Sequence, residues 1–167
     1  MAELVRQYFY LALLMRRPQD VSANELTLPF GLALSLVTYV ITLAALIGIG
    51  PAVLRAVADL TLTGAALYVA LYLTGKSARF AQSFGGYCGA VAIVNLAALP
   101  LYVGQGSRAA ESVGLGDFVL LVWNLSLIGH VIRHTFEVRL PIGILYAFGY
   151  VLVITSLLAS LLPPAGA

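Results

Sequence analysis

Charged residues are scarce in this chain. Asp, Glu, Lys and Arg make up 10% of its 167 residues, whereas 61% are hydrophobic. Soluble domains have about 25% charged residues, so this composition excludes an ordinary soluble fold. The formal net charge is only +2, and the basic residues are dispersed, which argues against nucleic acid as a partner. The composition therefore predicts a chain that is surrounded by lipid.

Motifs that support catalysis are also missing from the sequence. There is one cysteine, Cys88, which cannot form an internal disulfide and lies among glycines, so we interpret it as a small packing residue. The sequence has no HExxH pattern, no glycine-rich phosphate loop, no carboxylate dyad and no pairing of a nucleophile with a base. We therefore expect a protein that is not an enzyme and carries no cofactor.

Apolar stretches repeat along almost the whole chain, and each is close to the length of about 20 residues that crosses a bilayer. The predicted fold class is all-α, a polytopic membrane helical bundle of five transmembrane helices within residues 28–164. The expected spans are residues 28–49, 53–74, 84–103, 118–134 and 140–162. Three local features are expected around them: Pro51 in the first turn of the second span, Asp117 as the cap of the fourth, and Pro163-Pro164 closing the fifth.

Residues 1–27 form a separate leading segment. Its residues 2–17 have bulky apolar side chains and basic ends, and they are too short and too charged to cross the bilayer. We predict an amphipathic helix that lies at the membrane interface and is stopped by Pro18.

The basic residues alternate with the predicted spans. Seven of the nine Lys and Arg residues fall on the side that carries the N-terminus, and two fall on the other side. The positive-inside rule then places the N-terminus in the cytoplasm and the C-terminus outside. The seven are Arg6, Arg16, Arg17, Lys76, Arg79, Arg133 and Arg139, and the two are Arg55 and Arg108.

The start of the third span carries the small residues Gly85, Gly86, Gly89 and Ala90. Small residues allow membrane helices to approach backbone to backbone, which matters where lipid provides no hydrophobic drive for association. We predict that Gly85 and Gly89 form the contact with a neighbouring helix.

The predicted spans contain one aspartate, Asp59, and two asparagines, Asn95 and Asn124. Asp59 lies about 9 Å along the second span, one turn from Arg55, and either pairs with this arginine or forms a proton or cation site. The two asparagines either hydrogen-bond across the bundle and fix helix pairing, or line a polar path.

The side rich in basic residues offers two further hypotheses. His130 and His134 are four residues apart on one helical face, which is the spacing for two metal ligands, although no third ligand is evident. Alternatively these histidines form a cationic collar that binds lipid phosphate or an acidic partner. The other members of the collar are Lys76, Arg79, Arg133 and Arg139. Both features are also consistent with simple topology determinants.

Two stretches resemble the bacterial members of the Yip family of small polytopic membrane proteins. They are GKSARFAQSFGGY, which leads into a third span with Pro100 near its end, and WNLSLIGHVIRH in the fourth span. Eukaryotic members are adaptors for Rab-type GTPases and have a longer cytosolic N-terminal region. The resemblance implies an integral adaptor or accessory subunit of a bacterial inner membrane.

Together these observations predict a non-enzymatic adaptor that associates with membrane lipids and with a membrane-protein partner or a second copy of itself. The near-total membrane burial leaves only intramembrane faces and short turns for such contacts. Two alternatives stay open: a small transporter or channel that uses the intramembrane polar residues, and a lipid-headgroup-binding protein that uses the basic collar.

Overall fold

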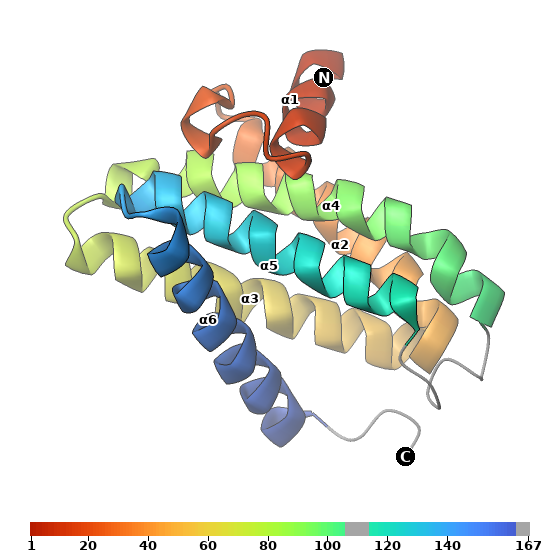
Figure 1. Ribbon diagram of the computed structural model, residues 1–167. Coiled ribbons are helices and arrows are strands. Elements are labelled where there is room, and N and C mark those ends of the chain that lie inside the picture. Colours follow the sequence, from red (N-terminus) through yellow and green to blue (C-terminus); the bar gives the residue numbers. More distant parts are fainter. Residues whose placement is uncertain (106–113, 163–167) are drawn as a thin grey trace.

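The computed structural model describes residues 1–105 and 114–162, and every regular element in those ranges is helical. Five of the helices are long and apolar enough to cross a membrane, which confirms the predicted fold class (Figure 1). They are α2 (Thr27–Ile47), α3 (Ile49–Leu73), α4 (Phe80–Gln105), α5 (Leu115–Phe136) and α6 (Leu140–Leu161).

Four of the five spanning helices start earlier than the hydropathy pattern predicts, whereas α6 starts at Leu140 as predicted. Only Gly48, with a φ of 82°, separates α2 from α3, so Pro51 falls in the first turn of α3 as expected. Asp117 does not precede α5 but lies in its first turn, where its carboxylate accepts a hydrogen bond from the Gly114 amide at 2.9 Å. Residues Pro163 and Pro164, expected to end the last span, are outside the described ranges.

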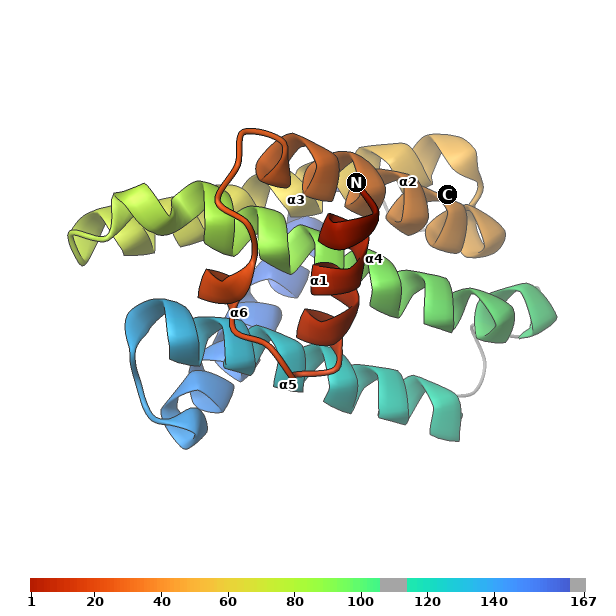
Figure 2. The ribbon, with the colours of Figure 1, turned by 90° about the horizontal axis from the view of Figure 1, so that it is seen from above.

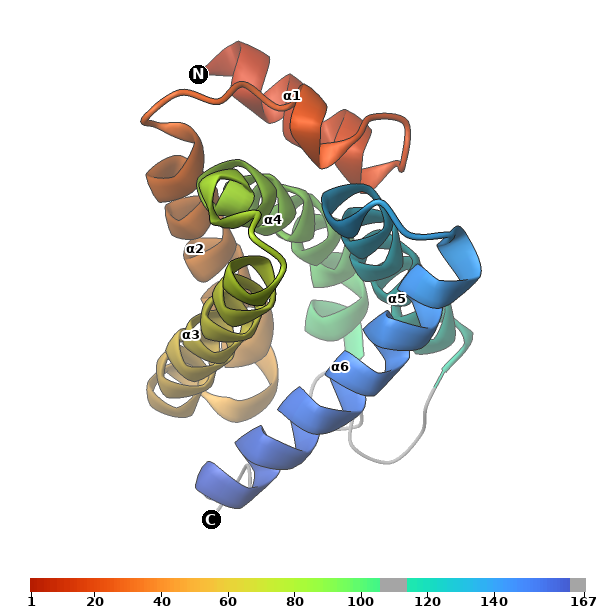
Figure 3. The same ribbon diagram turned by 90° about the vertical axis from the view of Figure 1, so that its left-hand side faces the viewer.

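Helices α2 to α5 run roughly alongside one another, whereas α6 is steeply inclined to them (Figures 1 and 3). One end of the bundle, which we call the basic end, carries residues 74–80 and 133–140. Helix α4 lies at the centre, and it contacts α1, α2, α3 and α5. The single cysteine, Cys88, is fully buried in this helix.

Glycine allows two pairs of helices to touch through their backbones. A Cβ atom on Gly31 of α2 would lie 2.3 Å from the carbonyl oxygen of Gly85 in α4. A Cβ atom on Gly143 of α6 would lie 2.6 Å from the carbonyl oxygen of Gly129 in α5. The close helix contact that was predicted at Gly85 is therefore present, and its partner is α2.

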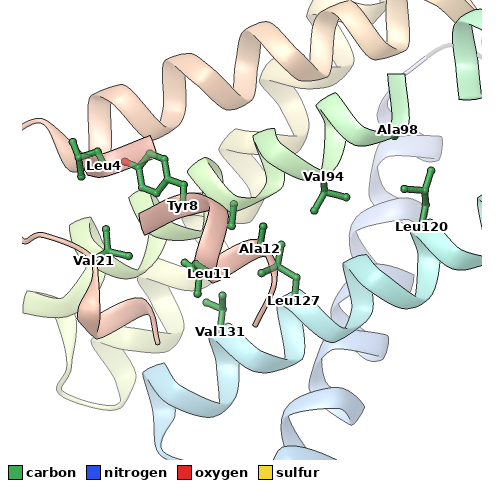
Figure 4. Packing of buried hydrophobic residues seen from close by; sticks show 11 residues of the cluster. Leu4, Tyr8, Leu11, Ala12, Val21, Val94, Ala98, Leu120, Leu127 and Val131 are labelled. Atoms are coloured by element: carbon green, nitrogen blue, oxygen red, sulfur yellow. The ribbon is translucent and has the colours of Figure 1, made fainter. Parts of the chain in front are cut away.

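The N-terminal segment folds back on the flank of the bundle. Helix α1 (Ala2–Ala12) crosses α4 and α5, followed by the short helix η1 (Pro18–Asp20) (Figures 2 and 4). The prediction that Pro18 ends the first helix was wrong. The chain turns earlier because Leu14 takes a left-handed conformation, with a φ of 61°, and the Met15 amide donates to the Tyr10 carbonyl at 2.9 Å.

Helix α1 buries one apolar face against α4 and α5, where Tyr8, Leu11 and Ala12 are fully buried (Figure 4). A Cβ atom on Gly89 would lie 2.3 Å from the Tyr8 ring, and one on Gly86 would lie 3.3 Å from Leu11. These two glycines therefore form a socket for α1. The sequence had suggested that Gly89 contacts a neighbouring span instead. Ala90, which is also fully buried, belongs to the same cluster.

Hydrogen bonds from three long side chains hold the segment in place. The Tyr8 hydroxyl donates to the Thr27 carbonyl at 2.8 Å, and burial raises the pKa of Tyr8 to about 12, which keeps the donor protonated. The Trp123 indole donates to the Ala12 carbonyl at 2.8 Å, and the Gln82 amide donates to the Val21 carbonyl at 2.6 Å. The leading segment is thus an integral part of the bundle.

Replacing Tyr8 with alanine is expected to lower the free energy of unfolding by about 3 kcal/mol, because it empties the Gly89 socket and removes a buried hydrogen bond. Chemical unfolding in detergent measures this change. Phe9→Ala is the matched control, because Phe9 is 47% exposed on the opposite face of α1. Equal effects of the two substitutions would contradict the socket.

Candidate functional site

A cavity of about 510 Å³ lies between α3, α5 and α6 and is partly open to the surroundings. The cavity forms because α6 is inclined to α3 and so leaves space beside it (Figure 3). Helices α3 and α6 meet where the hydroxyl groups of Thr63 and Tyr150 form a hydrogen bond. From this contact the two helices diverge toward the basic end, and α5 forms the wall between them.

The walls of the cavity are almost entirely apolar. Helix α3 presents one stripe of small and medium side chains at helical spacing, including Leu67 and Ala70. Helix α5 contributes Ile128 and Ile132, and α6 contributes the ring of Tyr146. Such a surface binds hydrocarbon and has few partners for a polar solute.

The deep end of the cavity is polar. Thr63 and Tyr150 close it with the hydrogen bond described above, and Tyr87 of α4 lies beside Tyr150. Three hydroxyl groups from three helices therefore face the floor of an otherwise apolar site. A polar atom of a ligand at this depth would find hydrogen-bonding partners there.

The mouth of the cavity lies at the basic end and carries an ion-paired group. Glu137, in the turn between α5 and α6, contacts the Lys76 ammonium at 3.2 Å and the Arg79 guanidinium at 2.8 Å. The same cations donate to the last carbonyls of α5, those of Phe136 and Thr135, both at 3.4 Å. Positive charge at a helix C-terminus is favourable because it complements the helix dipole.

The hydrogen bond from Arg79, together with that from Lys76, lowers the pKa of Glu137 below its ordinary value of 4.5. A lowered pKa in the folded state means that these ion pairs stabilise the protein above pH 4.5 and are lost as the pH falls through the folded-state pKa. Because Glu137 is exposed, the stabilisation is small.

Glu137→Gln is accordingly expected to lower the Tm slightly at pH 7 and to leave it unchanged at a pH where wild-type Glu137 is protonated. Thermal unfolding in detergent across this pH range measures the difference. Glu25→Gln is the control, because Glu25 has no ion pair within the described residues. A difference that persists at acid pH would show that charge is not its cause.

The structure divides the predicted basic collar into two groups. Lys76 and Arg79 are half-buried and paired with Glu137, whereas Arg133 and Arg139 are exposed and have no ion pair in residues 1–105 and 114–162. All four lie at the basic end, in the two turns at the mouth of the cavity. The collar is therefore built around one acidic residue that sequence spacing did not single out.

His130 and His134 lie together with their ring centroids 4.5 Å apart. The Nε2 atom of His130 lies 2.8 Å from the Arg16 carbonyl and forms a hydrogen bond that helps to hold the leading segment. Within the part of the chain that the structure describes, no group of three His, Cys, Asp or Glu residues that could hold a metal is found.

Asp59 does not form the expected ion pair with Arg55, since the ion pairs of the described chain do not include it. Helix α3 begins at Ile49, so Asp59 lies about 15 Å along it, deeper than the sequence suggested. Its polar neighbours are Tyr39 of α2 and Arg55. The proton-site or cation-site hypothesis for Asp59 stays a prediction.

The two intramembrane asparagines do not join helices through their side chains in the described part of the bundle. The Asn124 amide donates to the Leu120 carbonyl of its own helix at 3.0 Å, and the Asn95 amide nitrogen has no hydrogen-bond partner among residues 1–105 and 114–162. The cross-helix bond at this level comes from the Thr42 hydroxyl, which donates to the backbone carbonyl of Asn95 at 3.4 Å.

Comparison with protein-family models, curated proteins and solved structures finds no match to this chain. The resemblance to the Yip family therefore stays a prediction. Apart from Lys76, the residues that line the cavity were not singled out from the sequence. The sequence does contain a pattern that indicates a shared surface. Cavity residues recur on one face of α3, namely Thr63, Leu67, Ala70 and Thr74, and Tyr146 and Tyr150 lie one turn apart in α6.

Proposed function

We propose that this protein binds a membrane lipid, with an acyl chain held in the cavity between α3, α5 and α6. The observation that carries the proposal is an apolar cavity of about 510 Å³ within the spanning helices, with polar groups only at its floor and mouth. Its volume is within the range of about 300 to 1,000 Å³ that is typical of small-molecule sites.

The chemistry of the walls favours a hydrocarbon chain over an ion or a sugar. Ile128, Ile132 and Leu67 offer no hydrogen bonds, and burying a polar group against them without a partner costs roughly 1 to 3 kcal/mol. An acyl chain has no such cost. Because the cavity is partly open to the surroundings, a lipid can enter it without crossing the protein.

The distribution of Lys and Arg supports a membrane placement in which the basic end faces the cytoplasm. Helix α2 has 21 residues, which is about 31 Å and close to the hydrocarbon thickness of a bilayer. Tyr8 reaches the first residue of α2, Thr27, so this part of α1 is level with the start of that span, whereas Ala12 at the other end of α1 contacts Trp123 in the middle of α5. The positive-inside rule favours the cytoplasmic side for this end, and a bacterial inner membrane suits this topology.

Native mass spectrometry of the protein in mild detergent tests the proposal. We expect one lipid molecule per chain to remain bound after detergent exchange that removes loosely associated lipid. Protein that is folded by its thermal transition and carries no lipid under all detergent conditions would contradict it. Quantitative extraction of lipid from the same sample provides an independent count.

A second candidate is the adaptor function, and the arrangement of α6 favours a specific surface for it. The small-residue face of α4 is filled by α1 and α2, so it cannot receive a partner. Helix α6 packs on α5 through Gly143 but leaves Leu145, Phe148 and Leu152 more than half exposed. A partner or second copy would bind there. Strictly monomeric protein by light scattering, with no reproducible partner, would count against it.

A further inference from the structure

The mouth of the cavity indicates which class of lipid it holds, and this inference rests on the proposed function. We infer that the lipid is anionic, and that its headgroup takes the place of the Glu137 carboxylate between Lys76 and Arg79. In the present structure Glu137 occupies this position as an internal anion. The lipid and the carboxylate would thus compete for the same two cations.

Glu137 lies where a headgroup would emerge from the cavity. Its neighbours in the chain, Phe136 and Val138, both line the cavity, and so does Lys76. A chain that fills the apolar space therefore reaches the surface beside the Glu137 carboxylate. The oxygens of that carboxylate are 3.2 Å from the Lys76 ammonium and 2.8 Å from the Arg79 guanidinium.

The charge balance at this end leaves room for a further anion. The two turns at the basic end, residues 74–80 and 133–139, hold four Lys or Arg side chains and one acidic side chain. One carboxylate therefore serves two cations, while Arg133 and Arg139 stay exposed beside it. A phosphate group offers more acceptor oxygens than a carboxylate, and guanidinium and ammonium groups bind it well.

The Glu137 side chain can leave its place at little cost. The side chain is 61% exposed. Glu137 is the residue that caps the C-terminus of α5, and its backbone is in the left-handed conformation with a φ of 63°. Exposed ion pairs contribute little to stability, so water can replace the lost contacts. Displacing this group therefore does not require the helices to move.

Titration of delipidated protein with two lipids of equal acyl chains tests the inference. The probes are palmitoyl-oleoyl phosphatidylglycerol, which is anionic, and palmitoyl-oleoyl phosphatidylcholine, which has no net charge, with binding measured by native mass spectrometry. We expect the anionic lipid to bind about tenfold more tightly, since each nearby cation contributes several-fold. The double variant Lys76→Gln/Arg79→Gln is expected to lose this preference, with a smaller loss of affinity for phosphatidylcholine than for phosphatidylglycerol.

Glu137→Gln tests whether the Glu137 carboxylate competes with the lipid headgroup for Lys76 and Arg79 or instead supports the binding site. Removing the internal anion is expected to raise the affinity for phosphatidylglycerol several-fold and that for phosphatidylcholine less. Glu3→Gln is the matched control, because Glu3 is an exposed carboxylate paired with Arg6 at 2.7 Å in α1. Weaker binding of phosphatidylglycerol by Glu137→Gln would overturn the inference.

The outcomes separate the inference from the proposal on which it rests. If both lipids bind saturably and with equal affinity, the cavity holds lipid but does not select an anion, and only the inference fails. If neither lipid binds saturably to folded protein, the proposed function fails as well. A preference for phosphatidylglycerol that survives in the double variant would place the anion site elsewhere and also overturn the inference.

Discussion

Gly31→Val is expected to destabilise the protein by about 3 kcal/mol or more. A Cβ atom at this position would lie 2.3 Å from the carbonyl oxygen of Gly85. The clash is with backbone, which cannot rotate away as a side chain can, so α2 and α4 would have to separate. The yield of monodisperse protein and its chemical unfolding in detergent measure the effect.

Gly149→Val provides the matched control. Gly149 lies within α6, and a Cβ atom there would have no neighbour within 4 Å among the residues that the structure describes. This variant introduces the same side chain into a spanning helix without a clash, so we expect nearly wild-type stability. Equal destabilisation by both variants would mean that the effect comes from valine in a helix and not from the contact between α2 and α4.

Ala70→Trp is expected to abolish retention of the bound lipid. Ala70 lies in the α3 wall of the cavity, and an indole side chain there occupies space that the acyl chain would need. The expected result is protein with a normal thermal transition and less than a tenth of the lipid bound by the wild type. A tenfold loss of affinity corresponds to about 1.4 kcal/mol, which is within reach of a steric block.

Two further variants make this result interpretable. Ala66→Trp places the same ring at the exposed edge of the cavity, so it blocks entry even if Ala70→Trp fails to fold. Val69→Trp lies on the outer face of α3, where Val69 is 53% exposed and does not line the cavity. If Ala70→Trp or Ala66→Trp retains as much lipid as Val69→Trp, the result would count against the site.

The sequence was sufficient to predict the five spans because apolar length is a direct requirement of the bilayer. It was less accurate at the ends of the helices. Helix α3 starts at Ile49 and not at residue 53, since a single glycine, Gly48, is enough to separate it from α2. Helix α1 ends at Ala12 because Leu14 adopts a left-handed conformation that leucine rarely takes.

The contacts between elements could be predicted only in part. Small residues at Gly85 and Gly89 correctly indicated close approach, but whether a backbone or the Tyr8 ring fills the space depends on how the chain folds back. The cavity could not be predicted from hydropathy, because the spans are apolar on most faces and their periodicity has little contrast. It depends on the inclination of α6, which is set by tertiary packing.

Photo-crosslinking with a lipid that carries a diazirine on its acyl chain tests the central claim most directly. The protein is reconstituted in nanodiscs that contain the lipid, irradiated, digested and mapped by mass spectrometry. We predict that adducts concentrate on cavity residues such as Leu67, Ile132 and Tyr146, and that unlabelled lipid suppresses them. Adducts spread evenly over outward residues such as Val69 and Leu152, with none in the cavity, would contradict the account.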